Sequence, residues 1–112
     1  MKVLDSIIKY DAGDMEKAMK IYVNDIGVVI EIDMGESLNT ATNLKLGVRK
    51  PDNTEVEWTP TVYGTEFNFL RYTTVANDLD QAGVWKVNPF LSLGGWTGRA
   101  DTVSFEVFDK YN

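Results

Sequence analysis

The stretch NLKLGVRKPDNTEVEWTPTV, residues 43–62, decides the fold. Apolar residues recur at every second position in both halves of it, and polar residues fill most of the positions between. The apolar positions are Leu44, Leu46 and Val48, then Val56, Trp58 and Val62. A period of two predicts β-strands with one face on a core and the other on solvent, as is typical of antiparallel sheets. Residues 51–54 carry a proline and two Asx residues where a tight turn requires them, so residues 43–50 and 55–62 are predicted to form a hairpin.

The same alternation occurs along most of the chain. It predicts strands over residues 20–24, 28–33, 66–72, 84–91 and 102–108. In the strand at 66–72 the apolar positions change phase between Phe69 and Leu70, which predicts a bulge or a sheet switch there. Glycines at 64, 83 and 94–95 mark further reversals. About seven short strands separated by regular turn signals predict an all-β, immunoglobulin-like antiparallel β-sandwich, and a small barrel is the competing architecture.

The first 18 residues have a different pattern. Val3, Leu4, Ile7 and Ile8 fall on one side at helical spacing, and residues 14–18 favour a helix. We therefore expect a short, partly helical N-terminal arm over residues 1–18 and the sandwich domain over residues 19–112. The arm is too short to be a stable helix alone, so its apolar side is expected to rest on the sandwich or on a neighbouring subunit of a homo-oligomer.

The composition excludes several classes of function. The chain has 112 residues, no cysteine, no histidine and a formal net charge of −6. Without cysteine there is no disulfide scaffold, zinc–thiolate site or thiol nucleophile, and without histidine the commonest general base is missing. The acidic balance argues against a nucleic-acid partner, and no apolar run is long enough to cross a membrane. We expect no cofactor, no resident metal and no enzymatic activity.

Residues 79–87, LDQAGVWKV, resemble the corner between strands E and F of immunoglobulin domains. In that corner an Asp and a small residue precede a Gly-x-Tyr-x-Cys motif. Here Trp85 occupies the tyrosine position and Val87 the cysteine position, and the Asp lies one residue further upstream. The resemblance implies that the Trp85 side chain replaces the tyrosine, and an indole N–H can donate a hydrogen bond as a tyrosine hydroxyl does. It also implies a domain without the inter-sheet disulfide.

Residues 48–58, VRKPDNTEVEW, are similar to the VRKPDGT-x-V-x-W hairpin of small proteins encoded in tailed-phage and prophage genomes. The similarity continues through residues 79–87, 95–99 and 102–107. It implies an immunoglobulin-like virion component of the tail or baseplate, or a head decoration, akin to the N-terminal domain of upper-baseplate proteins. Such a protein is made in the bacterial host cytoplasm and located in the virion, where its partners are other virion proteins and further copies of itself. The family brings no catalytic motif.

Two acidic patterns have alternative interpretations. Asn77, Asp78 and Asp80 resemble a calcium loop, but the order of ligands in that motif fails, which favours Asp side chains that cap a turn. Glu55 and Glu57 lie about 7 Å apart by the strand rise, a spacing that glycosidases use. They belong to an outward-facing hairpin, where a solvated pair is the expected reading because a raised carboxylate pKa requires burial.

The three tryptophans divide into core and candidate binding residues. Trp85 is in phase with Val87 and is expected to pack in the core, and Trp58, in phase with Val56 and Val62, is expected to lie in the core or half-buried. Trp96 and Arg99 lie in a glycine-flanked loop, residues 94–99, and are candidate interface anchors unless Trp96 folds back onto the end of the sandwich. The alternative function is a carbohydrate- or receptor-binding module, for which Trp96, Trp58 and Tyr63 would form an aromatic platform for a glycan.

Overall fold

The computed structural model describes residues 5–10 and 20–111. Over these ranges the chain forms strands and no helix. The strands are β1 (Asp5–Tyr10), β2 (Ile21–Tyr22), β3 (Val28–Asp33), β4 (Thr42–Arg49), β5 (Glu55–Trp58), β6 (Thr61–Tyr63), β7 (Phe69–Thr73), β8 (Gly83–Leu93), β9 (Trp96–Arg99) and β10 (Val103–Phe108). Among the described residues, none belongs to a helix that could span a membrane.

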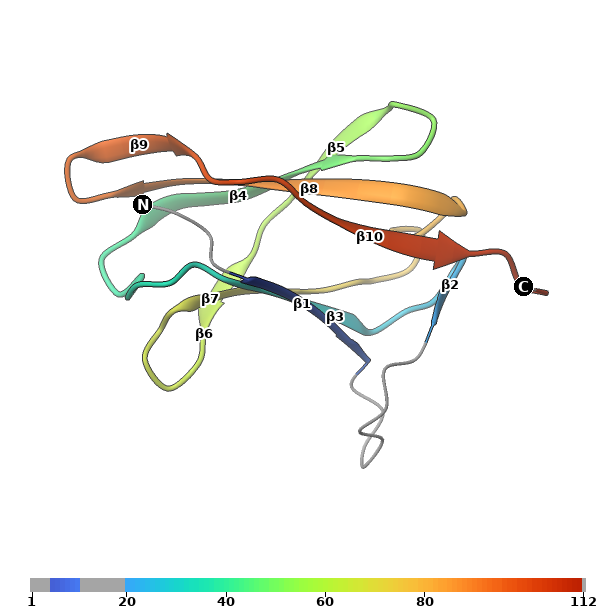
Figure 1. Cartoon of the computed structure of the whole chain (residues 1–112), viewed down its shortest axis with the longest axis horizontal. Coiled ribbons are helices and arrows are strands. Elements are labelled where there is room, and N and C mark those ends of the chain that lie inside the picture. Colours follow the sequence, from blue (N-terminus) through green and yellow to red (C-terminus); the bar gives the residue numbers. More distant parts are fainter. Residues whose placement is uncertain (1–4, 11–19, 112) are drawn as a thin grey trace.

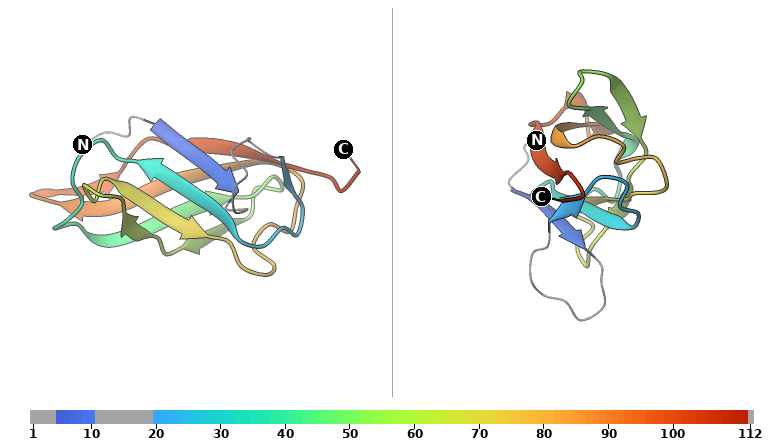
Figure 2. Two further views of the ribbon diagram at one scale, coloured as in Figure 1. Left: turned by 90° about the horizontal axis from the view of Figure 1, so that it is seen from below. Right: turned by 90° about the vertical axis from the view of Figure 1, so that its right-hand side faces the viewer.

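The strands form two layers, which Figure 1 shows one above the other and Figure 2 shows from below and from one end. The four-stranded sheet has the order β1-β3-β7-β6. The six-stranded sheet has the order β2-β10-β8-β4-β5, with β9 also paired to β8. Neighbouring strands are antiparallel apart from β2, which runs parallel to β10. The expected all-β sandwich is confirmed at this level.

The hairpin predicted from residues 43–62 is present, but its second strand is interrupted. Leu46 pairs with Trp58 and Arg49 with Glu55, around the turn at residues 50–54. The chain then crosses to the other layer, where β6 pairs with β7. Pro60 lies at the crossing and has no N–H to continue a ladder, which ends β5. Val56, expected in the core, is 38% exposed because the β4–β5 hairpin projects beyond the opposing sheet (Figure 1).

The segment at residues 94–99, expected to be a flexible loop, is mostly a strand. Leu93 pairs with Trp96, so the turn consists of Gly94 and Gly95 alone, and β9 continues the edge of β8. Residues 100–102, between β9 and β10, then belong to no strand. Pro89 faces this gap: its carbonyl accepts a hydrogen bond from the Ala100 N–H at 2.9 Å, and its missing N–H lies on the same side. A proline is tolerated in this central strand because the opposing strand is broken there.

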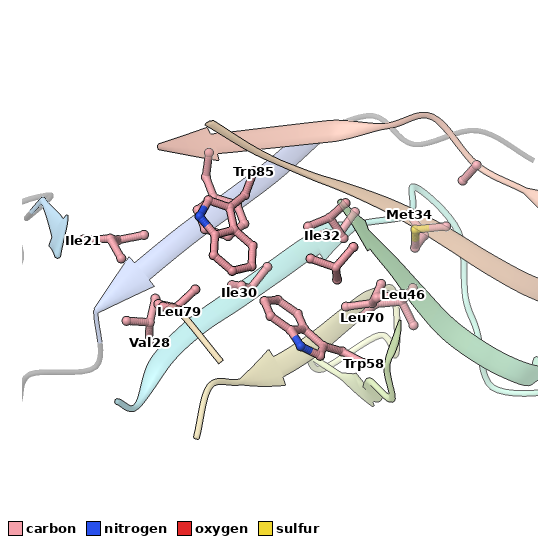
Figure 3. Packing of buried hydrophobic residues seen from close by; sticks show 14 of the residues in the cluster. Ile21, Val28, Ile30, Ile32, Met34, Leu46, Trp58, Leu70, Leu79 and Trp85 are labelled. Carbon is pink, nitrogen blue, oxygen red and sulfur yellow. The ribbon is translucent and has the colours of Figure 1, made fainter. Parts of the chain in front are cut away.

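The core lies between the layers, and Trp58 and Trp85 lie among its aliphatic side chains (Figure 3). Ring centroids are 4.6 Å apart between Trp58 and Tyr72, 6.2 Å between Trp58 and Trp85, and 6.0 Å between Trp85 and Phe105. Such pairs add about 0.5–1.5 kcal/mol each beyond the burial of their surface. Ile30 and other aliphatic side chains of β3 and β7 cover them from the four-stranded sheet. Trp58 and Trp85 are core residues, as predicted.

The corner before β8 is fixed by Trp85. Its indole N–H donates a hydrogen bond to the Gln81 carbonyl at 3.0 Å, four residues upstream. The side chain is fully buried, so this bond satisfies a donor that would otherwise cost free energy. The replacement of a tyrosine by Trp85 that the sequence suggests is therefore matched by a hydrogen bond from the ring to the preceding backbone.

The helical interpretation of the N-terminal arm is wrong over residues 5–10, which form β1. All six residues pair with β3, from Asp5 opposite Asp33 to Tyr10 opposite Val28. An isolated short helix is unstable in water, whereas the edge of β3 offers a row of backbone partners. Ile7 and Ile8 therefore lie in a strand. Val3, Leu4 and residues 11–18 lie outside the described residues.

The predicted irregularity between Phe69 and Leu70 is also wrong. The pairing of β3 with β7 is continuous from Asp33 opposite Phe69 to Val29 opposite Thr73. The apparent change of phase arises because Phe67 is not in a strand. It lies in the turn between β6 and β7 with φ +56°, its N–H bonded to the Gly64 carbonyl.

Candidate functional site

The outer face of the six-stranded sheet contains an open depression of about 570 Å³, bounded by β4, β5, β8 and β9. We call it the outer-face groove. Its side chains form three rows across the strands, set by the pairing register. The rows are Glu55–Arg49–Lys86, Glu57–Gly47–Asn88 and Lys45–Phe90–Arg99. They point outward because they alternate with buried residues such as Val48 and Val87.

The first row combines an ion pair with a repulsive neighbour. Arg49 Nη2 lies 3.0 Å from Glu55 Oε2, with both side chains more than half exposed. On its other side Arg49 is directly opposite Lys86. Like charges in directly opposed positions of a sheet are destabilising. The positive charge of this row therefore gathers on β4 and β8, away from β5.

The second row forms the floor of the groove. Gly47 carries no side chain, and a Cβ built there would meet the Asn88 carbonyl at 3.5 Å and Arg99 Nη1 at 3.6 Å. The Asn88 amide donates to the Ala100 carbonyl at 2.9 Å and to Thr102 Oγ1 at 3.1 Å. Asn88 thus links β8 to the irregular segment between β9 and β10, and its own oxygen faces Arg99.

The third row holds the arginine in place. Arg99 Nη1 donates to Asn88 Oδ1 at 3.1 Å, and its guanidinium lies over the Phe90 ring, 5.3 Å from the centroid. The amide and the ring together orient the guanidinium above Gly47. At the other end of the row, Lys45 Nζ is 3.3 Å from Glu57 Oε1.

The groove has the opposite charge to the rest of the protein. It is lined by four bases and two acids, a net charge of +2, in a chain of net charge −6. The remainder of the chain therefore carries −8. Paired Glu55 and Glu57 match the expected solvated carboxylates of an outward-facing hairpin, and each is bound to a base rather than held next to the other.

The sequence-predicted binding residues do not gather at one place. Arg99 lies in the groove, but Trp96 is on the inner side of β9, half buried against the core, with its ring over Gly98. Trp58 is 5% exposed and covered by neighbouring rings. Tyr63 is exposed on the four-stranded sheet, with the Arg71 guanidinium 4.1 Å from its ring centroid. Trp96, Trp58 and Tyr63 therefore form no common platform.

The acidic loop at residues 77–80 is built as a turn cap. Asp78 Oδ2 accepts hydrogen bonds from the Val75 N–H at 2.8 Å and the Tyr72 hydroxyl at 2.6 Å, while Asp80 is 3.0 Å from Lys50 Nζ. Burial, and then the bond to Asp78, raise the pKa of Tyr72 well above its usual value. No group of three acidic side chains that could hold a metal ion occurs within residues 20–111.

A second hollow of about 430 Å³ lies at the turn between β6 and β7. Tyr63 and Phe67 line it, and their side chains are 45% and 49% exposed. A left-handed backbone at a bulky residue such as Phe67 is uncommon and costs about 1–2 kcal/mol.

Sequence reasoning missed Lys86, Asn88, Phe90 and Gly47. Alternation with Trp85 and Val87 indicates that Lys86 and Asn88 face outward, but it does not say which strands flank them. Only the register places them beside Gly47 and Arg99.

Comparison of the chain with protein-family models, with curated proteins and with solved structures gives no match.

Proposed function

We propose that this protein is a non-enzymatic structural component of a phage or prophage particle, in the tail or baseplate or as a head decoration, that acts by docking onto other virion proteins. The resemblance of residues 48–58, 79–87, 95–99 and 102–107 to small virion proteins supports the class. The observation that carries the docking role is the outer-face groove. Its charged side chains other than Lys86 are held by ion pairs or hydrogen bonds, and together they present a charge opposite to that of the remaining chain.

An immunoglobulin topology is part of this proposal. In that fold strands A, B, E and D form one sheet and strands C, F and G the other. The order β1-β3-β7-β6 corresponds to A-B-E-D, and the order β10-β8-β4 corresponds to G-F-C. β5 then extends the second sheet beyond C, as in variable-type domains. An experimental structure with β6 hydrogen-bonded to β5 instead of β7 would contradict the assignment.

Self-association through the N-terminal arm or a sheet edge is a further part of the proposal. β1 is the outer strand of the four-stranded sheet, and β2 covers only Val107 and Phe108 of β10. Unpaired strand edges are ready partners for another chain. Size-exclusion chromatography with light scattering, at micromolar protein concentration, should give a mass above that of the monomer. A monomer for both the full chain and a form without residues 1–18 would refute this part.

The virion proposal is tested by quantitative mass spectrometry of purified particles from a host that carries the gene. The chain should be present in a fixed ratio to a tail protein and should remain through density-gradient purification. Its absence from intact particles would overturn the proposal.

A carbohydrate- or receptor-binding module is the second candidate, favoured by the exposed rings of Tyr63 and Phe67 at one hollow. Stacking on sugar rings uses such side chains. Glycan-array binding that is lost on Tyr63→Ala but retained on Trp96→Ala would favour it over assembly alone, since the Tyr63 ring is exposed whereas the Trp96 side chain is half buried.

A further inference from the structure

Two bases of the outer-face groove have no acidic partner among the described residues. Within the described part of the chain, neither Lys86 nor Arg99 lies within 4.0 Å of a carboxylate. Their neighbours Lys45 and Arg49 are paired, to Glu57 and Glu55. Lys86 is exposed and directly opposite Arg49, an arrangement that weakens the sheet. The groove is therefore left with uncompensated positive charge on the β8 and β9 side.

The Arg99 side chain is also preorganised to bind a ligand. Asn88 orients it by one hydrogen bond and is itself fixed by bonds to Ala100 and Thr102. A guanidinium has five N–H donors in a rigid fork, which suits a carboxylate. Because Gly47 has no side chain, the guanidinium lies close over its backbone, with Nη1 3.6 Å from the position of a Cβ, and the half-buried Phe90 adds an apolar contact under the same guanidinium.

We propose that the groove binds an acidic segment of a partner protein, with its carboxylates on Lys86 and Arg99. This inference rests on the proposed docking function and names the chemistry of the partner. The charge pattern selects a short acidic segment over a nucleic acid. Glu55 and Glu57 line the β5 side, and the rest of the chain carries −8, so a continuous row of phosphates that extends beyond Lys86 and Arg99 meets net negative charge. Localised carboxylates meet the bases and avoid the acids.

The test is a titration of the ¹⁵N-labelled full chain, followed by NMR. The probes are an acetylated, amidated hexapeptide of glutamate and the same peptide of glutamine. The glutamate peptide should shift the amide signals of Gly47, Lys86 and Asn88 and the Arg99 side-chain signal. Raising NaCl from 0.05 to 0.5 M should weaken its binding about tenfold, because ionic pairing at a surface is screened.

Charge-neutral variants locate the site. Lys86→Gln breaks no ion pair or side-chain hydrogen bond to a described residue and should keep the fold, and it should weaken glutamate binding at least threefold. Arg99→Gln should also weaken glutamate binding at least threefold. The matched control is Lys110→Gln, an exposed lysine outside the groove, which should change binding less than twofold. Spectral dispersion of each variant verifies folding.

The inference is overturned by equal shifts with the glutamine peptide, by shifts that map away from the groove, by no shift at millimolar peptide, or by tighter binding of duplex DNA. Its failure is separable from failure of the docking function. If the wild-type chain is found in virions and Lys86→Gln with Arg99→Gln is incorporated equally well, the acidic-partner inference falls while the virion role stands. If the chain is absent from virions but the peptide results hold, the virion role falls while the acidic-segment inference stands.

Discussion

Replacement of Trp85 by phenylalanine tests the physical account of the corner before β8. The change removes the hydrogen bond from the indole to the Gln81 carbonyl, worth about 1 kcal/mol. It also leaves part of a fully buried ring site empty, at about 2 kcal/mol for the lost carbon burial and the cavity. We therefore expect the free energy of unfolding to fall by about 3 kcal/mol. For a domain of this size the melting temperature should fall by about 12 °C.

The matched control is Trp58→Phe. Trp58 is almost as buried and also stacks on a ring, but its indole makes no backbone hydrogen bond to a described residue. Trp58→Phe should lower the free energy of unfolding by about 2 kcal/mol, so the two variants should differ by about 1 kcal/mol. Urea unfolding followed by circular dichroism measures both values. Equal destabilisation by the two changes, or a loss below about 1 kcal/mol for Trp85→Phe, would refute the reasoning.

Three further predictions concern single positions. Phe67→Gly should be more stable than Phe67→Ala by about 1 kcal/mol in urea unfolding, since both lose the ring but only glycine accepts φ +56° without strain; equal stabilities would contradict this. Tyr72→Phe should lose about 1.5 kcal/mol at neutral pH with the bond to Asp78. Because the fold raises the pKa of Tyr72, its contribution is complete below about pH 10, the pKa of an unfolded tyrosine, and is lost as pH rises through the folded pKa. The wild type should thus lose more stability than Tyr72→Phe between pH 9 and 11, and parallel losses would exclude the effect. Gly47→Ala should keep or raise the melting temperature because the added Cβ makes only ordinary contacts. Gly83→Ala should lower it, because Gly83 has φ +130° and the added Cβ would lie 2.8 Å from Pro51 Cβ; the reverse order of melting temperatures would contradict this.

The strands in the middle of the chain could be predicted because their signal is local. In β4 and β10 the side chains alternate between a core and solvent, in β3 the first five residues are all buried although the sequence alternates, and the turn residues between β4 and β5 set the hairpin. The predicted ends agree with the structure to within one residue for these strands. Burial of Trp58 and Trp85 followed from the same alternation.

The errors occur where a neighbour in space decided the conformation. Asp5–Tyr10 has helical spacing of its apolar residues, but the free edge of β3 makes it a strand. Residues 96–99 look like a loop because of their glycines, but the long strand β8 offers them a ladder. Phe67 contributed a false change of phase because nothing in the sequence marks a left-handed phenylalanine.

Side-chain alternation by itself determined the all-β class, the core tryptophans and the outward direction of Lys86 and Asn88, because a strand has a period of two whatever it pairs with. The direction of Arg99 came from the structure, since its segment looks like a loop in the sequence. Only the tertiary structure decided that these three side chains share one groove over Gly47. That grouping depends on which strands are neighbours and in which register, and both are set by backbone hydrogen bonds between segments distant in the chain. A shift of one residue in the pairing of β8 with β9 would turn Arg99 away from Asn88, and the same shift between β4 and β8 would turn Arg49 to the other face, away from Lys86.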